Sequence, residues 1–504
     1  MSSPSSFPLI FLCCFLLFVS SSLGKTTTRP KALVLQVTKD AKTLQYVTQV
    51  SQRTPLVPVK LTLDLGGEYM WVNCERGYKS SSYRPATCGS APCKLLNTTA
   101  CDTACKTTTR PKALVLQVTK DAKTLQYVTQ VSQRTPLVPV KLTLDLGGEY
   151  MWVNCERGYK SSSYRPATCG SAPCKLLNTT ACDTACYSAP APDCYNNTCS
   201  HSPSNNIANR GTPGQLGADV FTIRSSNGKN VLRVVTVPRL YFVCATNWLA
   251  DGLASGVTGM AGLGWTGASL PAQLSSYFRF DRKFALCLSS STRASGVVFF
   301  GNGPYTLLPN VDASLSLTYT PLIQNPITES GFVGDASPKY FIGVTSIKIN
   351  DKPIKFNKTL LTIDEEAMPK NVKKVSNVKP FGACFSSKNI GSTRLGPAVP
   401  SIDLVLQNKS VYWRIYGANS MVEAKKNVLC LAIVEARKDF RPRFSVVLGG
   451  HQLEDNLLQF DLSKSRLGFT SSLLGRSTTC VNGWLYWKGN WRQSKMEAGI
   501  ESEE

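Results

Sequence analysis

Histidine is nearly absent from this chain, and cysteine never occurs in a CxxC pair. The two histidines, His201 and His451, stand far apart in the sequence. Structural zinc sites combine closely spaced Cys and His ligands, so a zinc site is excluded, and no other metal or cofactor is expected. A Ser-His-Asp triad would need one of these two histidines, and neither lies in a Gly-x-Ser-x-Gly motif.

Negative charge is also scarce. Asp and Glu number 32 against 56 Lys and Arg, which gives a formal net charge of +24. The cationic residues are dispersed and match no RNA- or DNA-binding module, so no nucleic-acid partner is expected. The excess of positive charge indicates either solubility in an acidic extracellular space or attraction to an acidic partner, such as a cell-wall polyanion or an acidic enzyme.

Long apolar runs are absent after residue 24. Before it, Phe7 to Val19 is almost unbroken apolar but too short to span a bilayer, and the small residues Ser20 to Gly24 follow. This pattern predicts a cleaved signal peptide over residues 1–24, with a signal anchor as the alternative. We therefore expect a secreted protein of the extracellular space or cell wall that is not transmembrane.

One segment is present twice. Lys25 to Cys105 is repeated letter for letter as Lys106 to Cys186; we call these segments copy one and copy two. Solenoid repeats diverge and recur several times, so a single identical repeat indicates a recent tandem duplication or an error in the assembled gene. Copy two runs directly into the rest of the chain and is expected to complete the fold. Copy one is then a surplus segment with unpaired strand edges.

The cysteine count supports this interpretation. Without the two cysteines of the signal peptide the chain has 17, an odd number, whereas with one copy removed it has 12. Oxidising compartments disfavour unpaired thiols, so the ancestral unit is predicted to hold one copy and six disulfides. Each disulfide would stabilise the fold by about 2–4 kcal/mol. The full chain is expected to keep at least one free thiol.

Several blocks of sequence predict strands and turns in a fixed order. Three stretches of copy two are rich in β-branched residues and predict strands over 113–118, 125–131 and 138–144. The third stretch ends in Asp145-Leu-Gly-Gly148, ahead of an aromatic-rich segment that reaches Cys155. Later blocks are a glycine-rich turn over 259–264, a short helix over 269–274 and closing strands over 445–471.

These blocks resemble the pepsin-like aspartic proteases, in which Asp-Thr-Gly-Ser ends the first active-site strand. The resemblance implies an all-β fold of two lobes, each a double-ψ β-barrel. The N-terminal lobe would span residues 106–310 and the C-terminal lobe residues 311–480. Copy one, residues 25–105, would be a duplicate of the N-terminal half-lobe.

Further stretches are similar to a plant subgroup: extracellular dermal glycoprotein, basic 7S globulin and the xylanase inhibitors. These stretches are 235–239, 340–344, 381–385 and 392–397. The subgroup implies a non-proteolytic inhibitor of cell-wall-degrading glycosidases, such as a xyloglucan endoglucanase or a xylanase. The expected partner is a microbial glycoside hydrolase of family 11 or 12, with a small peptide as a second candidate. Two alternatives stay open: an aspartic-type endopeptidase, and a basic 7S globulin-like storage or peptide-binding protein.

Protease chemistry is expected to fail. Aspartic proteolysis needs two carboxylates that share one proton. The resemblance assigns the first to Asp145, with Asp64 as its duplicate, but Leu146 and Gly148 replace the supporting threonine and serine. In the second lobe Asp364 is followed by two glutamates and no glycine turn. The block with the second motif therefore looks deleted, the second lobe is predicted to be truncated, and Asp145 is predicted to be vestigial and unpaired.

A basic loop over 437–443 is the candidate inhibitor surface, because in the plant subgroup this loop lies on the face used against glycosidases. Guanidinium groups bind carboxylates through paired hydrogen bonds, which suits a glycosidase cleft; a solvated charged turn is the alternative. A strand over 444–448 is expected to follow. The candidate side chains are Arg437, Phe440, Arg441 and Arg443, with Lys388 and Arg394 in a second loop.

Asn-x-Ser/Thr sequons predict glycosylation in a secreted chain. They lie at Asn97, Asn178, Asn196, Asn357 and Asn408. The tail over 481–504 departs from the subgroup. Its four aromatic residues indicate either a binding patch or an extension without a role.

Overall fold

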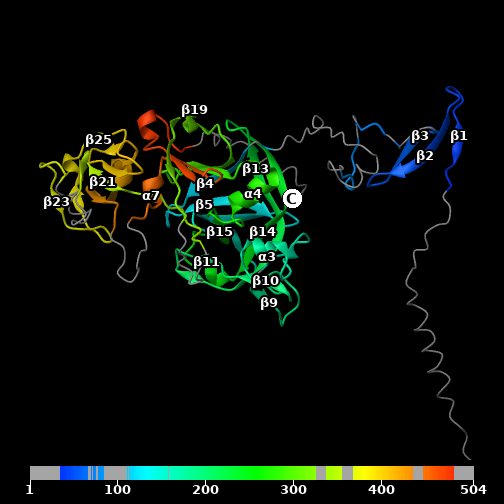
Figure 1. Cartoon of the computed structure of the whole chain (residues 1–504), viewed down its shortest axis with the longest axis horizontal. Helices are drawn as coiled ribbons and strands as arrows, with labels where there is room; N and C mark the ends of the chain where they lie inside the picture. Colours follow the sequence, from blue (N-terminus) through cyan, green and yellow to red (C-terminus); the bar gives the residue numbers. More distant parts are fainter. Residues whose placement is uncertain are drawn as a thin grey trace, which may run out of the picture. The chain divides into compact units, whose positions relative to one another are not determined.

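A computed structural model describes residues 34–65, 70, 72–74, 78–84, 111, 113–156, 158–324, 336–354, 367–434 and 446–481. The chain divides into two compact units, Met1–Thr108 and Thr109–Glu504. The boundary falls close to the junction of the two copies, so copy one lies in the first unit and copy two in the second. In Figure 1 copy one is blue and copy two begins in cyan.

The first unit contains a three-stranded antiparallel sheet. Its strands, in spatial order, are β1 (Val37–Lys39), β2 (Tyr46–Gln52) and β3 (Val57–Thr62). Asp40 fixes the turn between β1 and β2, because its Oδ1 accepts hydrogen bonds from the backbone N–H and the hydroxyl of Thr43. Large apolar side chains on these strands are exposed, including those of Val37 and Tyr46.

The second unit is built on a 15-stranded sheet, with the first three strands of copy two in its middle. These are β4 (Ala113–Lys120), β5 (Tyr127–Gln133) and β6 (Val138–Asp145). The spatial order is β20-β32-β31-β16-β17-β4-β5-β6-β15-β7-β14-β13-β10-β9, with β8 paired to β13. The other strands are β7 (Trp152–Asn154), β8 (Arg165–Pro166), β9 (Cys182–Asp183), β10 (Thr198–His201), β13 (Gly214–Ser226), β14 (Val231–Ala245), β15 (Gly259–Gly262), β16 (Lys283–Cys287), β17 (Ser295–Gly301), β20 (Thr318–Pro321), β31 (Leu457–Asp461) and β32 (Arg466–Phe469).

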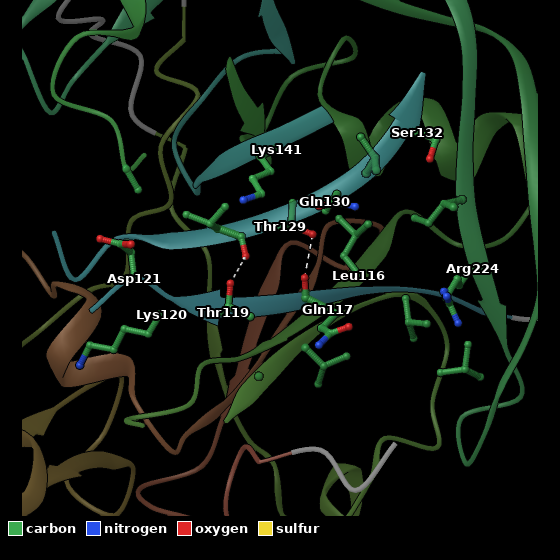
Figure 2. Close-up of a pocket in the computed structure, with 18 of the residues that line it drawn as sticks. Leu116, Gln117, Thr119, Lys120, Asp121, Thr129, Gln130, Ser132, Lys141 and Arg224 are labelled. Atoms are coloured by element: carbon green, nitrogen blue, oxygen red, sulfur yellow. Dashed lines mark hydrogen bonds between the residues drawn. The ribbon is translucent and has the colours of Figure 1, made fainter. Parts of the chain in front are cut away.

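Strand β13 closes this sheet into a barrel. β4 and β5 pair only from Val118 opposite Thr129 to Lys120 opposite Tyr127, and then diverge. Across the opening β13 pairs with the other end of both strands, which completes the ring β4-β5-β6-β15-β7-β14-β13. Figure 2 shows this opening, a cavity of about 760 Å³ with Arg224 of β13 at one end. The strands of copy two therefore form one wall of a closed barrel.

Residues 346–431 form two smaller sheets of four strands each. The first is β22 (Lys352–Pro353), β21 (Ser346–Ile349), β27 (Ile402–Val405) and β28 (Tyr412–Ile415). The second is β23 (Lys374–Val375), β24 (Cys384–Ser386), β30 (Val428–Leu431) and β29 (Met421–Lys425). The chain then returns to the large sheet, where Phe460 of β31 stacks on Phe284 of β16 with 4.7 Å between ring centroids. The predicted deletion follows Asp364, which lies outside the described residues, and it stays a prediction.

The helices of the described residues are short. They are α3 (Ala172–Leu176), α4 (Leu270–Phe278), α6 (Gly417–Ser420) and α7 (Gly450–Leu453), with 3₁₀ turns η1 (Asn247–Ala250), η2 (Ala313–Ser316), η3 (Ser387–Asn389) and η4 (Leu474–Arg476). Some hairpins are formed by strands of only two residues each. They are β11 (Ser204–Asn205) with β12 (Arg210–Gly211), β18 (Thr306–Leu307) with β19 (Val311–Asp312), and β25 (Ser392–Thr393) with β26 (Gly396–Pro397). None of the helices in the described ranges is long and apolar enough to cross a membrane.

The predicted elements are mostly confirmed. The helix over 269–274 is α4, which starts after Ser269 with Pro271 in its first turn and ends where Arg279 adopts a left-handed conformation. The glycine-rich turn over 259–264 begins as strand β15. The second predicted strand of copy two starts later than expected, because Leu125 has a positive φ of 58° and belongs to the preceding turn.

One strand prediction is wrong in its described part. Val446 to Leu448 form no strand and lead into α7, so His451 lies in a helical turn rather than at the start of a strand. The side chain of Gln452 explains the difference. Its Oε1 accepts a hydrogen bond from the N–H of Gly449 at 3.2 Å, and its amide donates to the carbonyl of Ala432 at 3.0 Å, which stabilises a helical turn at this point.

The cysteine prediction is confirmed for the one-copy unit. All 12 of its cysteines form six disulfides, which are Cys155–Cys244, Cys169–Cys182, Cys174–Cys199, Cys186–Cys194, Cys287–Cys480 and Cys384–Cys430. Cys74 of copy one is a free, exposed thiol.

Candidate functional site

Asp145 is the last residue of β6, at a point where two chain segments cross. β15 runs parallel to β6 with Asp145 opposite Gly262, and then pairs antiparallel with β7. The N–H of Leu263 donates to the carbonyl of Asp145 at 2.8 Å, and the N–H of Gly264 donates to the carbonyl of Gly148 at 2.8 Å. These bonds hold the two loops against each other at the predicted site.

Position 148 has no room for a side chain. A Cβ on Gly148 would lie 2.9 Å from Cα of Gly262 and 3.0 Å from Cγ of Asp145. The serine or threonine that the resemblance places here therefore does not fit this backbone. Leu146, which replaces the threonine, lines an apolar cavity of about 310 Å³ together with Leu322 and Phe460. Both substitutions remove hydroxyl groups that would bind the carboxylate.

The carboxylate of Asp145 has few polar neighbours. The N–H of Gly147 donates to its Oδ1 at 3.1 Å, and the amide of Asn206 lies 3.5 Å from its Oδ2. Burial raises the pKa of Asp145 above its ordinary value, against the lowering effects of the Gly147 hydrogen bond and the charge of Lys339. Burial thus makes this carboxyl group harder to ionise than an exposed aspartate.

A segment distant in sequence, residues 338–340, packs against the point where the two loops cross. The N–H of Trp265 donates to the carbonyl of Pro338 at 2.7 Å, and the hydroxyl of Tyr340 donates to the carbonyl of Leu263 at 2.6 Å. Trp265 and Tyr340 also stack, with ring centroids 6.0 Å apart. This anchored segment places Lys339 next to Asp145.

Lys339 occupies the space beside the Asp-Leu-Gly-Gly turn. Its Cγ lies 2.8 Å from where a Cβ on Gly147 would stand. The charge of the Lys339 ammonium group acts to lower the pKa of Asp145, and burial outweighs it.

The duplicate Asp64 is exposed and follows β3, which has no counterpart of β15 beside it in its own sheet. The predicted second acid, Asp364, lies outside the described residues. In the described part of the chain no cluster of three or more His, Cys, Asp or Glu could hold a metal ion.

Both histidines have structural partners. His201 Nδ1 lies 2.7 Å from the hydroxyl of Tyr150. His451 Nε2 lies 3.1 Å from the carbonyl of Met421, and its Nδ1 lies 3.3 Å from Oε2 of Glu454. The N–H of Ser202 also donates to His201 Nδ1 at 2.9 Å, through the serine backbone and not through its hydroxyl group.

Sequence reasoning missed the cluster around Glu454. Lys120 Nζ and the Tyr127 hydroxyl reach Glu454 Oε1 at 2.6 and 2.5 Å. Burial acts to raise the pKa of Glu454, but hydrogen bonds from His451, Lys120 and Tyr127 outweigh it, so the pKa lies below its ordinary value. These contacts join copy two to α7 across 334 and 327 residues of sequence, and no local pattern signals such a pairing.

The candidate inhibitor residues are placed only in part. The loop over 437–443, with Arg437, Phe440, Arg441 and Arg443, lies outside the described residues. Lys388 is exposed on η3, and Arg394 is exposed between β25 and β26, where its guanidinium donates to the hydroxyl of Ser477 at 2.7 Å. The two residues predicted to share a loop therefore lie on different elements.

Three of the five sequons have exposed asparagines. These are Asn178, Asn196 and Asn408. The other two, Asn97 and Asn357, lie outside the described residues, as does the tail from residue 482.

Two family models match this chain. The model described as "Xylanase inhibitor N-terminal" matches residues 46–123 and 127–302, and "Xylanase inhibitor C-terminal" matches 362–471. The first model thus covers most of copy one as well as copy two.

Relatives and solved structures agree with these matches. A protein named "Probable aspartic proteinase GIP2" from Nicotiana benthamiana is 52% identical over 422 residues, covering 77% of this chain and 96% of that protein. Basic 7S globulin from Glycine max is 34% identical over 415 residues, covering 75% of this chain and 92% of the relative. The crystal structure of EDGP has a TM-score of 0.71 and 49% identity, covering 74% of this chain and 98% of that one.

The all-β fold with a closed barrel and the likeness to EDGP confirm the predicted pepsin-like architecture. The two matched models and the relative with 52% identity confirm the predicted subgroup. This chain therefore belongs to the xylanase-inhibitor family of pepsin-like proteins.

Proposed function

We propose that this protein is a secreted, non-proteolytic inhibitor of microbial cell-wall-degrading glycoside hydrolases of family 11 or 12. The observation that carries the first half of the proposal is the closed space at position 148, where a side chain that bears a hydroxyl group does not fit beside Asp145. The second half is supported by membership of a family whose models are described as xylanase inhibitors.

Loss of protease chemistry follows from how the acid would have to act. An aspartic protease uses one ionised and one protonated carboxylate to activate a water held between them. The Lys339 ammonium group acts on Asp145 with a positive charge, whereas that mechanism uses a second carboxylate. With no space for a hydroxyl at position 148, the orientation of the carboxylate also lacks its usual support.

The proteolysis test is direct because one relative is named as a probable aspartic proteinase. The purified protein is incubated with a denatured protein substrate at acid pH, with and without pepstatin. We expect no cleavage. Pepstatin-sensitive cleavage that disappears in Asp145→Ala would establish the endopeptidase alternative instead.

For the inhibitory contact we propose the loop over 437–443. It places three arginines and a lysine within seven residues, around Phe440 and Pro442. Proline restricts the loop before binding, so less entropy is lost on docking. Glycosidase clefts carry two carboxylates, which an inserted guanidinium group would engage while blocking the substrate.

Inhibition constants against a family 11 xylanase and a family 12 endoglucanase test this contact. Losing one buried charge pair costs about 2–5 kcal/mol, so Arg443→Ala is expected to weaken inhibition more than tenfold. Lys388→Ala, an exposed cation on η3, is the matched control and should change it less. Equal, small effects would remove the loop from the interface. No inhibition by the parent protein would favour the storage or peptide-binding alternative, which the basic 7S globulin relative supports.

A further inference from the structure

Copy one keeps the local structure of copy two. Their hairpins have the same register, with Val47 opposite Thr62 in one and Val128 opposite Thr143 in the other. The turn contacts are also repeated. The guanidinium of Arg53 lies 4.2 Å from the ring of Tyr78, just as that of Arg134 lies 4.0 Å from the ring of Tyr159. The segment thus reaches its hairpin conformation in both units.

What copy one lacks is the surface on which copy two packs. Val115 is 5% exposed in an apolar cluster with Phe299 of β17, whereas its counterpart Val34 is 92% exposed. Met151 is 1% exposed and Met70 is 58% exposed. Copy two packs on this surface of the second unit. Copy one has the same residues, so its apolar side chains fit the same surface.

The cysteines repeat the same asymmetry. Cys155 of copy two is bonded to Cys244 of β14, while its counterpart Cys74 is a free, exposed thiol. Cys244 therefore has two identical segments with which it could form a disulfide.

We propose that the two copies are interchangeable partners for the same place in the barrel, so that the protein folds into two forms. In the major form copy two supplies the strands and Cys155–Cys244 closes them. In the minor form copy one supplies the strands, Cys74–Cys244 closes them, and copy two is displaced. The partner that fits the apolar face of copy one is thus the β13–β15–β17 surface of its own chain.

Conversion between the forms needs no external oxidant. The Cys74 thiolate attacks Sγ of Cys244, a Cys74–Cys244 bond forms, and Cys155 leaves as a thiolate that takes up a proton. This step leaves the number of disulfides and thiols unchanged. Cys174–Cys199 and Cys186–Cys194 also join copy two to the later chain, so displacement of copy two requires the same exchange with Cys93 and Cys105 of copy one. Since Cys155 and Cys244 are buried in the folded barrel, exchange takes place during folding or after partial unfolding of copy two.

Loop length decides which form dominates. Copy two joins directly to residue 187, and Cys186 and Cys194 close a loop with a sequence separation of 8. With copy one in the barrel, all of copy two becomes an insertion in the corresponding loop. Lengthening a loop about tenfold disfavours its closure by roughly thirtyfold, so about one molecule in thirty should hold copy one. Copy one of a second molecule would compete for this place only near millimolar protein concentration, because copy one and the barrel of the same molecule belong to one chain.

The test uses three full-length variants. Leu142 of copy two is fully buried and its counterpart Leu61 is half-buried. Leu142→Asp therefore prevents copy two from packing in the barrel, and Leu61→Asp prevents copy one from doing so. Leu142→Asp also marks the tryptic peptide that carries Cys155, which distinguishes it by mass from the peptide that carries Cys74. Each variant is refolded in a glutathione buffer, and the yield of monomer and the peptide joined to Cys244 are measured.

Leu61→Asp is expected to fold like the parent. Leu142→Asp is expected to yield monomer with the unmarked copy-one peptide joined to Cys244, and the double variant should lose at least tenfold in yield. A Leu142→Asp yield as low as that of the double variant would overturn the proposal. So would a folded Leu142→Asp monomer in which the marked peptide stays joined to Cys244.

Discussion

Copy one and copy two share every residue, yet only their hairpins and turns have the same structure. Asp40 and Asp121 each accept hydrogen bonds from the threonine three residues later, and Arg53 and Arg134 each lie over a tyrosine ring. Burial of the apolar side chains differs, as for Val34 and Val115, and so does the bonding of Cys74 and Cys155. The shared features come from contacts within the segment, and the features found in copy two alone come from its contacts with β13, β15, β17 and Cys244.

This comparison separates two kinds of information in one sequence. Turn residues and β-branched runs specify a hairpin without help from the rest of the chain. The apolar faces specify where that hairpin packs, but they stabilise it only when a partner surface is present. The predictions below test how far this separation holds.

Truncating a matched methionine should give the largest difference between the copies. Met151→Ala leaves a cavity in the barrel core and is expected to lower the free energy of unfolding by about 2–5 kcal/mol. Met70→Ala removes an exposed side chain and should change it by less than about 0.5 kcal/mol. Denaturant unfolding with the disulfides intact measures both. Similar losses in the two variants would mean that copy one is packed in solution.

Deleting one copy should change the number of free thiols in the protein. Deleting residues 25–105 gives the same protein as deleting 106–186, because the copies are identical. That shorter protein is expected to have no free thiol, whereas the full chain should have at least one and should lose one in Cys74→Ser. Labelling under denaturing conditions counts them. Several free thiols in the shorter protein would contradict the six-disulfide unit.

The matched aspartates should differ in how they affect stability with pH. The pKa of Asp145 is raised in the folded protein by burial, so its contribution to stability is present below its unfolded pKa and is lost as pH rises through the folded pKa. Asn cannot ionise, so Asp145→Asn should lose less stability than the parent between acid and neutral pH. Asp64→Asn is the control and should follow the parent. Thermal unfolding across this range tests the difference, and parallel profiles for all three proteins would show that Asp145 is not buried in solution.

The smallest difference is expected where the copies are locally identical. The pKa values of Asp40 and Asp121 are lowered by hydrogen bonds from the backbone and then the hydroxyl of Thr43 and Thr124. A lowered pKa gives stability above the unfolded pKa that is lost as pH falls through the folded pKa. Thr43→Ala and Thr124→Ala should therefore raise the two pKa values by equal amounts, measured by NMR titration of ¹³C-labelled carboxyl groups. A change in only one copy would show that distant residues act on these turns.

The sequence predicted most of what local patterns determine. Three strands of copy two, helix α4 and the full pairing of 12 cysteines were within reach, because they depend on β-branched runs, a Ser-Leu-Pro start and a parity argument. The pepsin-like architecture came from the resemblance of several sequence blocks to a known family. The described part of the strand predicted over 444–448 is wrong because the side chain of Gln452 stabilises a helical turn that follows it. Lys339 beside Asp145 and the Glu454 cluster were missed because residues hundreds of positions apart form them.

The glycine at position 148 has a consequence for the history of this protein. Its Cβ position is closed by the backbone of Gly262 and by Asp145 itself, so a serine there would force the two crossing loops apart. Restoring the serine of the Asp-Thr-Gly-Ser motif therefore needs an accompanying shift of the backbone at Gly262, whereas restoring the threonine at position 146 does not meet this contact.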